Sequence, residues 1–276
     1  MRTRFLRSSL LIVLALATTV SLLRRASVMP PASGRIIAQT SQDWGSIPFG
    51  GGECAVVNNT WNKEAAGKGF QQSVFVEEIS GKTAIGWRWS APWQLFPNVI
   101  SQPEIVCGNK PWDPKTRPDG GFPFRAGTKR LTAEFEVNLR AHGVYNMVFS
   151  LWGISDVQSP RQSITHEIMI WTDRAGQSPA GQHVDSMTVN DATYDVYIEE
   201  HQRDASGGNA NTWTYVAFVA RKPIFRGPLD ISAFIDYLLH RGTLNNTHYL
   251  TSLEFGNEVC HGAGVTEIQD FAINIH

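Results

Sequence analysis

The 276-residue sequence contains only three cysteines, has a net charge of −1, and has charged residues at 18% of its positions. Three cysteines are too few for a fold stapled by disulfides, and a chain of this length can bury a core without them. A near-neutral chain lacks the basic surface that binds nucleic acid. The low charge and the 11% aromatic residues also exclude a disordered chain. We therefore expect a folded protein that does not bind nucleic acid.

Several catalytic signatures are also missing. The sequence has no G-x-G-x-x-G dinucleotide motif, no phosphate-binding P-loop and no G-x-S-x-G nucleophile motif. Its aspartates, glutamates and histidines show no zinc-ligand spacing, so we predict neither a metal nor a cofactor. Tryptophan, in contrast, is abundant: the chain has nine, and their positions must be explained.

Residues 1–25 have the composition of an export signal. Three arginines among the first seven residues precede an uncharged, mostly apolar run from Ser8 to Leu23. This run is shorter than the roughly 20 residues that span a bilayer comfortably. We predict a signal peptide and a secreted protein, with an uncleaved signal anchor in the membrane as the alternative. The rest of the chain is net acidic, which suits a neutral partner, and we expect a monomer.

Residues 26–40 contain prolines, serines and a glycine and are predicted to be a linker. No tandem repeat or further change of composition follows, so we predict one domain over residues 41–276. In an oxidising compartment, three cysteines favour one disulfide and one free thiol. We expect the pair Cys54–Cys107, because Cys260 lies beside a candidate catalytic motif.

Most of the predicted domain has the character of β-strands. β-Branched and aromatic residues alternate with polar ones in Ser73–Glu78, Leu131–Leu139, Tyr145–Leu151, His166–Trp171, Tyr194–Glu199 and Thr214–Ala220. Many strands at short spacing predict an all-β sandwich or barrel. The exception is Pro228–Arg241, where apolar residues recur at helical spacing. We predict one amphipathic helix there, capped by Asp230 and ended by Gly242.

The segment His166–Trp171 contains the first candidate for catalysis. In a strand, Glu167, Met169 and Trp171 share one face, whereas His166 points to the other and is a poor partner for Glu167. A carboxylate beside a thioether and an indole suits sugar chemistry, because the indole offers a flat platform for a pyranose ring. From this strand alone, an exposed glutamate beside two partly buried residues is an equally good interpretation.

The second candidate is Glu258, which lies at a strand end between glycine-containing turns that allow a ligand to approach the backbone. A solvated glutamate at a loop tip is the commoner case, and Glu254 competes for the same role. Two carboxyls on neighbouring strands would suffice for glycoside hydrolysis, one attacking the anomeric carbon and one protonating the leaving oxygen. Apolar surroundings and a neighbouring carboxylate would raise the pKa of the acid.

Six segments in the same order resemble the motifs of glycoside hydrolase family 12, from about Val56 to Ile275. These are Asn58–Trp61, Gly86–Trp89, Pro103–Trp112, Tyr145-Asn146 with Leu151-Trp152, Glu167–Trp171 and Gly256-Asn257-Glu258. The resemblance implies a β-jelly-roll sandwich of two antiparallel sheets, with a concave substrate cleft. It also implies a retaining, endo-acting hydrolase of β-1,4-glucan chains. Cellulose, mixed-linkage glucan and xyloglucan all remain open as the preferred polymer.

The resemblance also implies roles for individual residues. Glu167 is then the nucleophile, which forms a glycosyl-enzyme, and Glu258 is the acid and then the base. The residues implied to line the cleft near the cleaved bond are Asn59, Trp61, Asn146, Met169 and Trp171, with Trp44 as a further platform. In a retaining enzyme the two carboxyls lie roughly 5–5.5 Å apart.

Two other classes of protein remain open. Tryptophan platforms serve a non-catalytic carbohydrate-binding jelly roll equally well, although such a module does not need two opposed carboxyls. A structural surface protein, held by an uncleaved N-terminal segment, is the third interpretation.

One departure from the family pattern generates a prediction. The family has an aspartate beside the nucleophile, and this chain has Ser150, which can donate a hydrogen bond to Glu167 but adds no charge. We expect Ser150→Asp to change the pH dependence of hydrolysis, because a nearby carboxylate raises the pKa of a neighbouring acid. Rates measured across the pH range for both proteins test this, and superimposable profiles would refute it.

Overall fold

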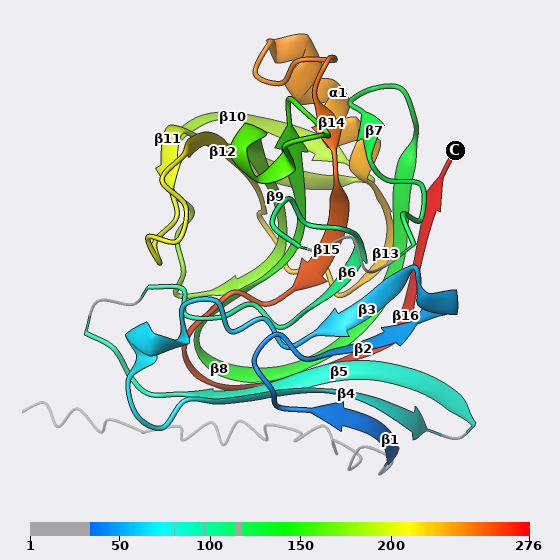
Figure 1. Ribbon diagram of the computed structural model, residues 1–276, viewed down its shortest axis with the longest axis vertical. Coiled ribbons are helices and arrows are strands. Elements are labelled where there is room, and N and C mark those ends of the chain that lie inside the picture. Colours follow the sequence, from blue (N-terminus) through cyan, green and yellow to red (C-terminus); the bar gives the residue numbers. More distant parts are fainter. Residues whose placement is uncertain (1–33, 80, 96–97, 114–117) are drawn as a thin grey trace, which may run out of the picture. The chain divides into compact units, whose positions relative to one another are not determined.

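The computed structural model describes residues 34–79, 81–95, 98–113 and 118–276. These residues belong to one compact unit, in which two layers of strands pack face to face (Figure 1). The first layer contains, in order, β1 (Arg35–Thr40), β4 (Gln71–Ile79), β5 (Lys82–Ala91), β16 (Val259–Ile275), the first half of β8 (Leu131–Ile154) and β13 (Arg226–Asp230). The layer is antiparallel throughout.

The second layer carries the candidate site. It contains β2 (Ser46–Phe49), β3 (Cys54–Val57), β6 (Glu104–Gly108), β15 (Ser252–Gly256), the second half of β8, β9 (Ile164–Ala175), β12 (Thr212–Ala220), β11 (Ala192–Arg203) and β10 (Gln182–Val189). Among the named strands, β9 and β12 form the one parallel pair. Two short strands, β7 (Phe124–Arg125) and β14 (Tyr249–Leu250), add to the edge of β8. The all-β sandwich is confirmed, with this parallel pair as an exception.

Strand β8 joins the two layers. The sequence predicted two strands here, Leu131–Leu139 and Tyr145–Leu151, but the structure has one continuous, strongly curved strand of 24 residues. Gly143 allows this, because its φ of 112° suits glycine, and a Cβ there would lie 2.2 Å from the carbonyl oxygen of His261. The close approach of β8 and β16 at this glycine therefore keeps the strand unbroken as it passes from one layer to the other.

Aromatic side chains fill the space between the layers. Phe149 of β8 stacks on Phe255 of β15 with ring centroids 4.2 Å apart, and Phe135, from the other half of β8, packs edge-on against both. All three rings are almost fully buried. Burial of rings from both layers is the main stabilising contribution of such a sandwich.

The predicted helix is confirmed as α1 (Ile231–Arg241). Asp230 accepts a hydrogen bond from the Ala233 amide at 3.3 Å, and Gly242 ends the helix in the left-handed region. The apolar face of the helix is buried, and Phe234 packs edge-on against Tyr194 of β11 and Phe218 of β12. The helix thus covers the core side of β11 and β12 and leaves their other face to the site.

The folded unit begins earlier than the sequence predicted. Residues Arg35–Thr40, assigned to the linker, form β1 and pair with β4. The linker prediction is therefore wrong at its C-terminal end, because the composition of a short edge strand does not show its pairing. The predicted signal segment, residues 1–25, lies outside the described residues. Within the described ranges, no helix is long and apolar enough to cross a membrane.

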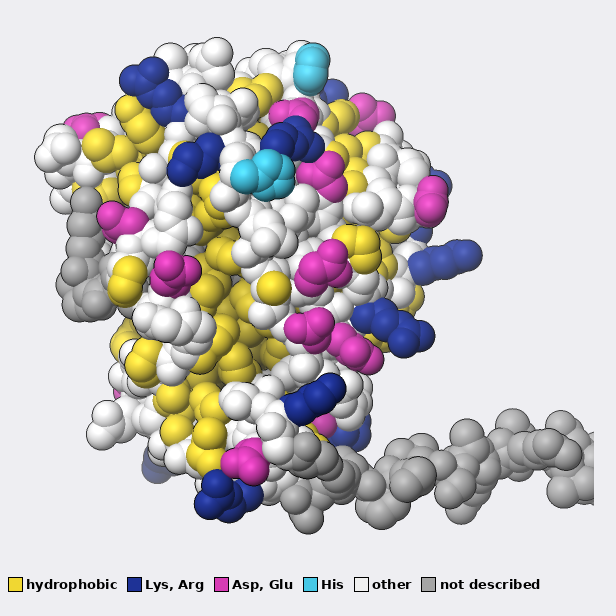
Figure 2. All heavy atoms as spheres, turned by 90° about the vertical axis from the view of Figure 1, so that its right-hand side faces the viewer, with side chains coloured by type: hydrophobic (Ala, Val, Ile, Leu, Met, Phe, Trp, Pro, Cys, Tyr) yellow, Lys and Arg dark blue, Asp and Glu magenta, His cyan; other side chains and the backbone are white. Residues whose placement is uncertain are grey.

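The side of the molecule that bears the C-terminal part of β16 exposes part of the core. Figure 2 shows this side, with apolar side chains gathered in a central hollow and charged side chains around it. Phe271, Ile273 and Ile275 of β16 are half-buried and pack against the core. Here the two layers are open at their rim, and the apolar core reaches the surface.

The cysteine pairing is confirmed. Cys54 of β3 and Cys107 of β6 lie opposite each other in the ladder and form a disulfide, while Cys260 is free and buried. The bond closes a loop between residues 53 positions apart in the sequence. It therefore limits the conformations that the unfolded chain can reach.

We expect the Cys54→Ser/Cys107→Ser variant to be less stable by about 2–4 kcal/mol, which is typical of such a loop. Thermal unfolding with and without a reducing agent measures this loss. The reductant should lower the melting temperature of the wild type and leave that of the variant unchanged. Both proteins keep the free Cys260, so this thiol does not account for a difference between them. Equal melting temperatures for the wild type and the variant in the absence of the reductant would contradict the prediction.

Candidate active site

Glu167 lies on β9 in the second layer. Its register neighbours are Trp152 on β8 and Tyr215 on β12, and Trp213 donates an indole hydrogen bond to its Oε2 at 2.9 Å. The alternating residues Ile168 and Ile170 are fully buried on the core side. The strand alternation predicted from the sequence is therefore confirmed, and it directs Glu167 away from the core.

His166 occupies the opposite face, as predicted. Its Nε2 donates to the Thr243 carbonyl oxygen at 2.8 Å, and its Nδ1 lies 3.0 Å from the Thr165 hydroxyl. Burial lowers its pKa below that of free histidine. The ring therefore helps to hold the chain behind β9 and does not contact Glu167.

Glu258 lies in the turn between β15 and β16 and is fixed by Asn146 of β8. The Asn146 Oδ1 accepts the Glu258 amide at 3.0 Å, the Asn146 amide donates to the Glu258 carbonyl oxygen at 3.1 Å, and the Asn146 Nδ2 donates to the Glu258 Oε2. Gln177 also donates to this Oε2, at 3.1 Å. Both side-chain donors therefore bind one oxygen, and Oε1 is left as the oxygen that can carry a proton.

Burial raises the pKa of both carboxyls. For Glu167 the largest cause is desolvation, followed by repulsion from Glu258, whereas the bond from Trp213 acts in the opposite direction. For Glu258 desolvation is again the largest cause, opposed by the bonds from Asn146 and Gln177. Because the two groups repel, they lose their protons in separate steps. Between these two steps the pair carries a single proton.

Both carboxyls line a cleft of about 710 Å³. Much of its wall is aromatic, and the rings are Trp44, Trp61, Trp112, Trp152, Trp213 and Tyr215. Trp152 packs edge-on against Trp112 at 4.7 Å and against Trp213 at 5.4 Å. Apolar rings around a few well-placed polar groups are typical of a ligand site.

The segments before β2 and after β3 also contribute to the cleft. Asn59 and Trp61, after β3, line it, as predicted, and so does Trp44, the proposed platform, which precedes β2. Trp44 has a φ of 60° and is 43% exposed. A tryptophan in the left-handed region is strained, and such residues gather at functional sites.

Two predicted cleft residues are elsewhere. Met169 and Trp171 are about 1% exposed and pack with Val148 and Tyr215, and neither lines the cleft. They share the face of Glu167, but the segment that follows β9 folds over them, and its Ala180 packs against the same cluster. The prediction that they line the cleft, with Trp171 as a sugar platform, is therefore wrong. Asn146 is also fully buried, and it acts by holding Glu258.

A buried ion-pair network lies beside the cleft. Lys110 Nζ lies 2.7 Å from Glu104 Oε1 and 3.0 Å from Glu254 Oε2. Asn59 Nδ2 donates to the same Glu104 oxygen at 2.8 Å. Ser150 donates to Glu254 Oε2 at 3.0 Å, rather than to Glu167 as the sequence suggested. Glu254, a possible acid in the sequence, is therefore an ion-pair partner of Lys110.

The turn before Glu258 depends on Gly256 and Asn257. A Cβ at Gly256 would lie 2.4 Å from the Pro103 carbonyl oxygen, so only glycine fits between β15 and β6. Asn257 accepts from Trp87 Nε1 at 2.8 Å and donates to the Asn146 carbonyl oxygen at 2.7 Å. This asparagine therefore connects the turn that carries Glu258 to the core.

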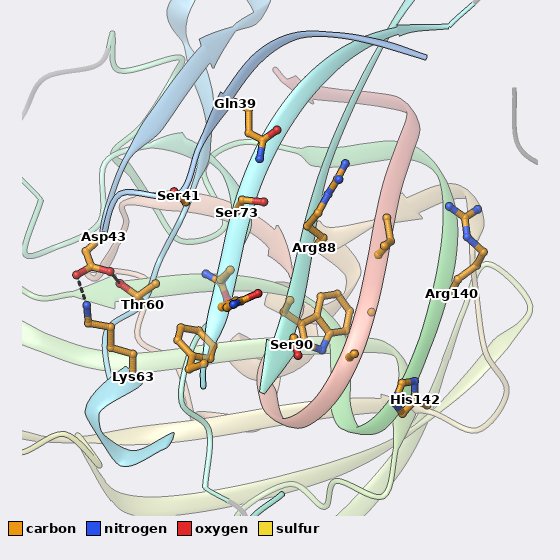
Figure 3. A pocket seen from close by; sticks show the side chains of 17 residues that line it. Gln39, Ser41, Asp43, Thr60, Lys63, Ser73, Arg88, Ser90, Arg140 and His142 are labelled. Atoms are coloured by element: carbon orange, nitrogen blue, oxygen red, sulfur yellow. Dashed lines mark hydrogen bonds and ion pairs between the residues drawn. The ribbon is translucent and has the colours of Figure 1, made fainter. Parts of the chain in front are cut away.

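A second groove, of about 820 Å³, lies on the first layer (Figure 3). It crosses β4, β5, β16 and β8, and Ser73, Arg88 and Arg140 are among the side chains that it exposes. Asp43 forms an ion pair with Lys63 and is the one carboxylate among its described lining residues. This groove contains no pair of carboxyls for acid and nucleophile among its described lining residues.

The chain matches the model of a known protein family. The family model described as glycosyl hydrolase family 12 matches residues 52–276. The chain belongs to glycosyl hydrolase family 12. The family 12 motifs that carry Glu167 and Glu258 both fall inside the matched region. The protein is accordingly a glycoside hydrolase.

Individual family 12 proteins resemble this chain over most of its length. Endoglucanase S of Pectobacterium parmentieri is 27% identical over 241 residues, covering 86% of this chain and 88% of that protein. The solved family 12 xyloglucanase from Bacillus licheniformis has a TM-score of 0.77 at 26% identity and covers 87% of this chain and 100% of its own. Inactive glycoside hydrolase XLP1 of Phytophthora nicotianae is 27% identical over 220 residues, covering 77% of this chain and 82% of that protein.

Several residues of this family 12 site were not predicted from the sequence. Trp213 lies two residues before Tyr215 on β12. Residues two positions apart in a strand share a face, so the sequence could have placed both rings on one side. Glu104 and Lys110 both belonged to a recognised motif, Pro103–Trp112, without an assigned role. Gln177 gave no signal, because its contact with Glu258 joins segments distant in the sequence.

Burial of Glu167 predicts an effect on stability. A folded-state pKa raised above the ordinary 4.5 makes ionisation harder in the folded protein, so stability falls as the pH rises above that value. Glu167→Gln removes the titrating carboxyl. The variant should therefore have a higher melting temperature than the wild type at pH 7 but not at pH 4. One pKa unit corresponds to about 1.4 kcal/mol, so we expect a gain of at least roughly 2–4 °C.

Thermal unfolding at the two pH values measures this difference. Glu136→Gln is the matched control, because Glu136 is exposed on β8 and its replacement should change neither melting temperature appreciably. A Glu167→Gln protein less stable than the wild type at pH 7 would show that the carboxylate is favourably solvated.

Proposed function

We propose that this protein is a secreted, endo-acting hydrolase of β-1,4-glucan chains that retains the anomeric configuration. The observation that carries the proposal is the pair of half-buried carboxyls, Glu167 and Glu258, in one aromatic cleft. The names of relatives, such as endoglucanase and xyloglucan-specific endo-beta-1,4-glucanase, support a β-1,4-glucan substrate. The arginine-led apolar segment at the N-terminus supports secretion.

The mechanism that we propose is double displacement. The ionised Glu167 attacks the anomeric carbon while Glu258 gives its proton to the leaving glycosidic oxygen, so one sugar chain departs as an alcohol and the other forms an ester with Glu167. Water then attacks the anomeric carbon, Glu258 takes the proton from this water, and the bond between the anomeric carbon and Glu167 breaks to release the carboxylate. Trp213 keeps an indole donor on the nucleophile, and Asn146 and Gln177 orient the acid.

The non-catalytic binding protein is the second candidate, and XLP1 shows that an inactive relative exists. The pair of carboxyls argues against it here, because two half-buried, mutually repelling carboxyls destabilise the fold and a binding module does not need such a pair. The aromatic wall contributes equally to both functions, so a measurement of hydrolysis must decide.

Release of reducing ends from cellulose, mixed-linkage glucan and xyloglucan tests the proposal. The wild type should cleave at least one of the three and lower its viscosity early, as endo action requires. Glu167→Gln should lose hydrolysis by several orders of magnitude, because the nucleophile is gone, yet retain binding to the same polymer. A wild type that binds without cleaving would support the binding protein instead.

Stereochemistry is measured separately. Proton NMR of the first products should show the β-anomer before mutarotation, as expected for carboxyls roughly 5–5.5 Å apart. An initial α-anomer would mean that Glu167 activates a water molecule and the enzyme inverts.

A further inference from the structure

Trp93 and Leu95 are the most exposed large apolar side chains in the part of the chain that the structure describes, at 70% and 69%. Both follow β5, in the connection to β6, which is described at residues 92–95 and 98–103. Single exposed apolar residues are common on protein surfaces. Two on one short segment, one of them an indole, are typical of a surface that binds a ligand or a partner.

The segment that carries Trp93 is fastened to the strand that follows Glu258. The Ile100 amide donates to the Val259 carbonyl oxygen, and the Val259 amide donates to the Ser101 carbonyl oxygen, each at 2.9 Å. Val259 comes directly after Glu258 in the chain. Backbone hydrogen bonds therefore set the position of this segment relative to the proposed acid.

Trp93 itself lies against the next residues of the same strand. Its ring packs against the His261 imidazole with centroids 6.4 Å apart and planes tilted by 54°, and the neighbouring Gln94 donates to the Cys260 carbonyl oxygen at 3.3 Å. Cys260 lines the cleft, and so does Val99 at the other end of the segment. The exposed indole therefore lies beside the cleft, on the side of the proposed acid, although it is not among the residues that line it.

The cleft determines what reaches this indole. An endo-acting hydrolase binds the interior of a polysaccharide, so the chain must leave the cleft at both ends and continue across the surface beside it. The flat, apolar face of a pyranose ring matches the face of an indole, a rigid side chain that loses little conformational entropy on binding. Because Trp93 is 70% exposed, its indole has room for such a ring on the side away from His261.

We propose that Trp93 is an outer sugar platform: a glucosyl unit of the β-1,4-linked chain stacks on its indole after the chain has passed Glu258. This inference rests on the proposed function, because it assumes that a glucan chain occupies the cleft. Trp93 contacts no reacting atom, so its stacking strengthens the substrate complex and the transition state equally. Such uniform binding lowers KM and leaves kcat unchanged.

Trp93→Ala and Trp93→Phe test the proposal, because alanine removes the platform and phenylalanine keeps a smaller one. On the polymer that the wild type cleaves best, we expect Trp93→Ala to raise KM about three- to tenfold, the range that one aromatic stacking contact supplies, with kcat within about twofold. Trp93→Phe should recover part of this loss. Among oligosaccharides of the same polymer, fractionated by length, the loss should be confined to those long enough to pass beyond the cleft.

Binding is measured without hydrolysis in a Glu167→Gln background. Calorimetric titration with mixed-linkage glucan and with xyloglucan should show about three- to tenfold weaker binding of the preferred polymer by Glu167→Gln/Trp93→Ala than by Glu167→Gln. Phe225→Ala is the matched control, because Phe225 is also an exposed aromatic residue but lies on the first layer, where its carbonyl oxygen accepts from the Val137 amide. It should change neither KM nor binding.

Unchanged KM and unchanged binding in the Trp93→Ala proteins overturn the inference. A lower melting temperature with no change in KM or binding would show that the indole only covers His261. A wild type that binds glucan but does not cleave it overturns the proposed function and leaves the binding comparison to decide on Trp93. A wild type that binds none of the polymers overturns both.

Discussion

The structure depends on the cost of placing two carboxyls out of bulk water within one cleft. Each of the two has donors brought from other parts of the chain, Trp213 of β12 for Glu167, and the side-chain amides of Asn146 of β8 and of Gln177, which follows β9, for Glu258. The ionised forms are stabilised by fixed dipoles that need not reorient when the cleft is occupied. The two-layer sandwich supplies a rigid frame for these donors, because its core is closed by interlocking aromatic rings.

The long strand β8 brings together parts of the site that are far apart in the sequence. Along its second half it presents Asn146 to Glu258, Ser150 to Glu254, and Trp152 to Glu167. The three side chains point to the same face of β8, because residues at even separations along a strand share a face. One strand therefore aligns the acid, the nucleophile and the buried ion-pair network, and a bend or break in it would disturb all three.

The family resemblance selected a sandwich over a barrel. Local periodicity was enough to predict an all-β fold, the helix and the face of Glu167, since these depend on neighbours two to four residues away. It was not enough to tell what covers that face. Met169 and Trp171 share the direction of Glu167, yet the segment after β9 buries them. The network of Lys110, Glu104 and Glu254 was not foreseen either, because its members come from two strands and a loop that meet only after folding. The start of β1 was missed for a similar reason, since Arg35 of β1 pairs with Glu78 of β4, which is distant in the sequence.

The tryptophans have a further consequence. Five of the nine line the cleft, and the indole of Trp213 is bonded directly to the carboxyl of Glu167. Indole emission responds to the polarity, charge and stacking partners around the ring. The protein thus carries its own optical probe at the place where sugar would bind, and its intrinsic fluorescence can follow both occupancy of the cleft and ionisation of the nucleophile without an added label.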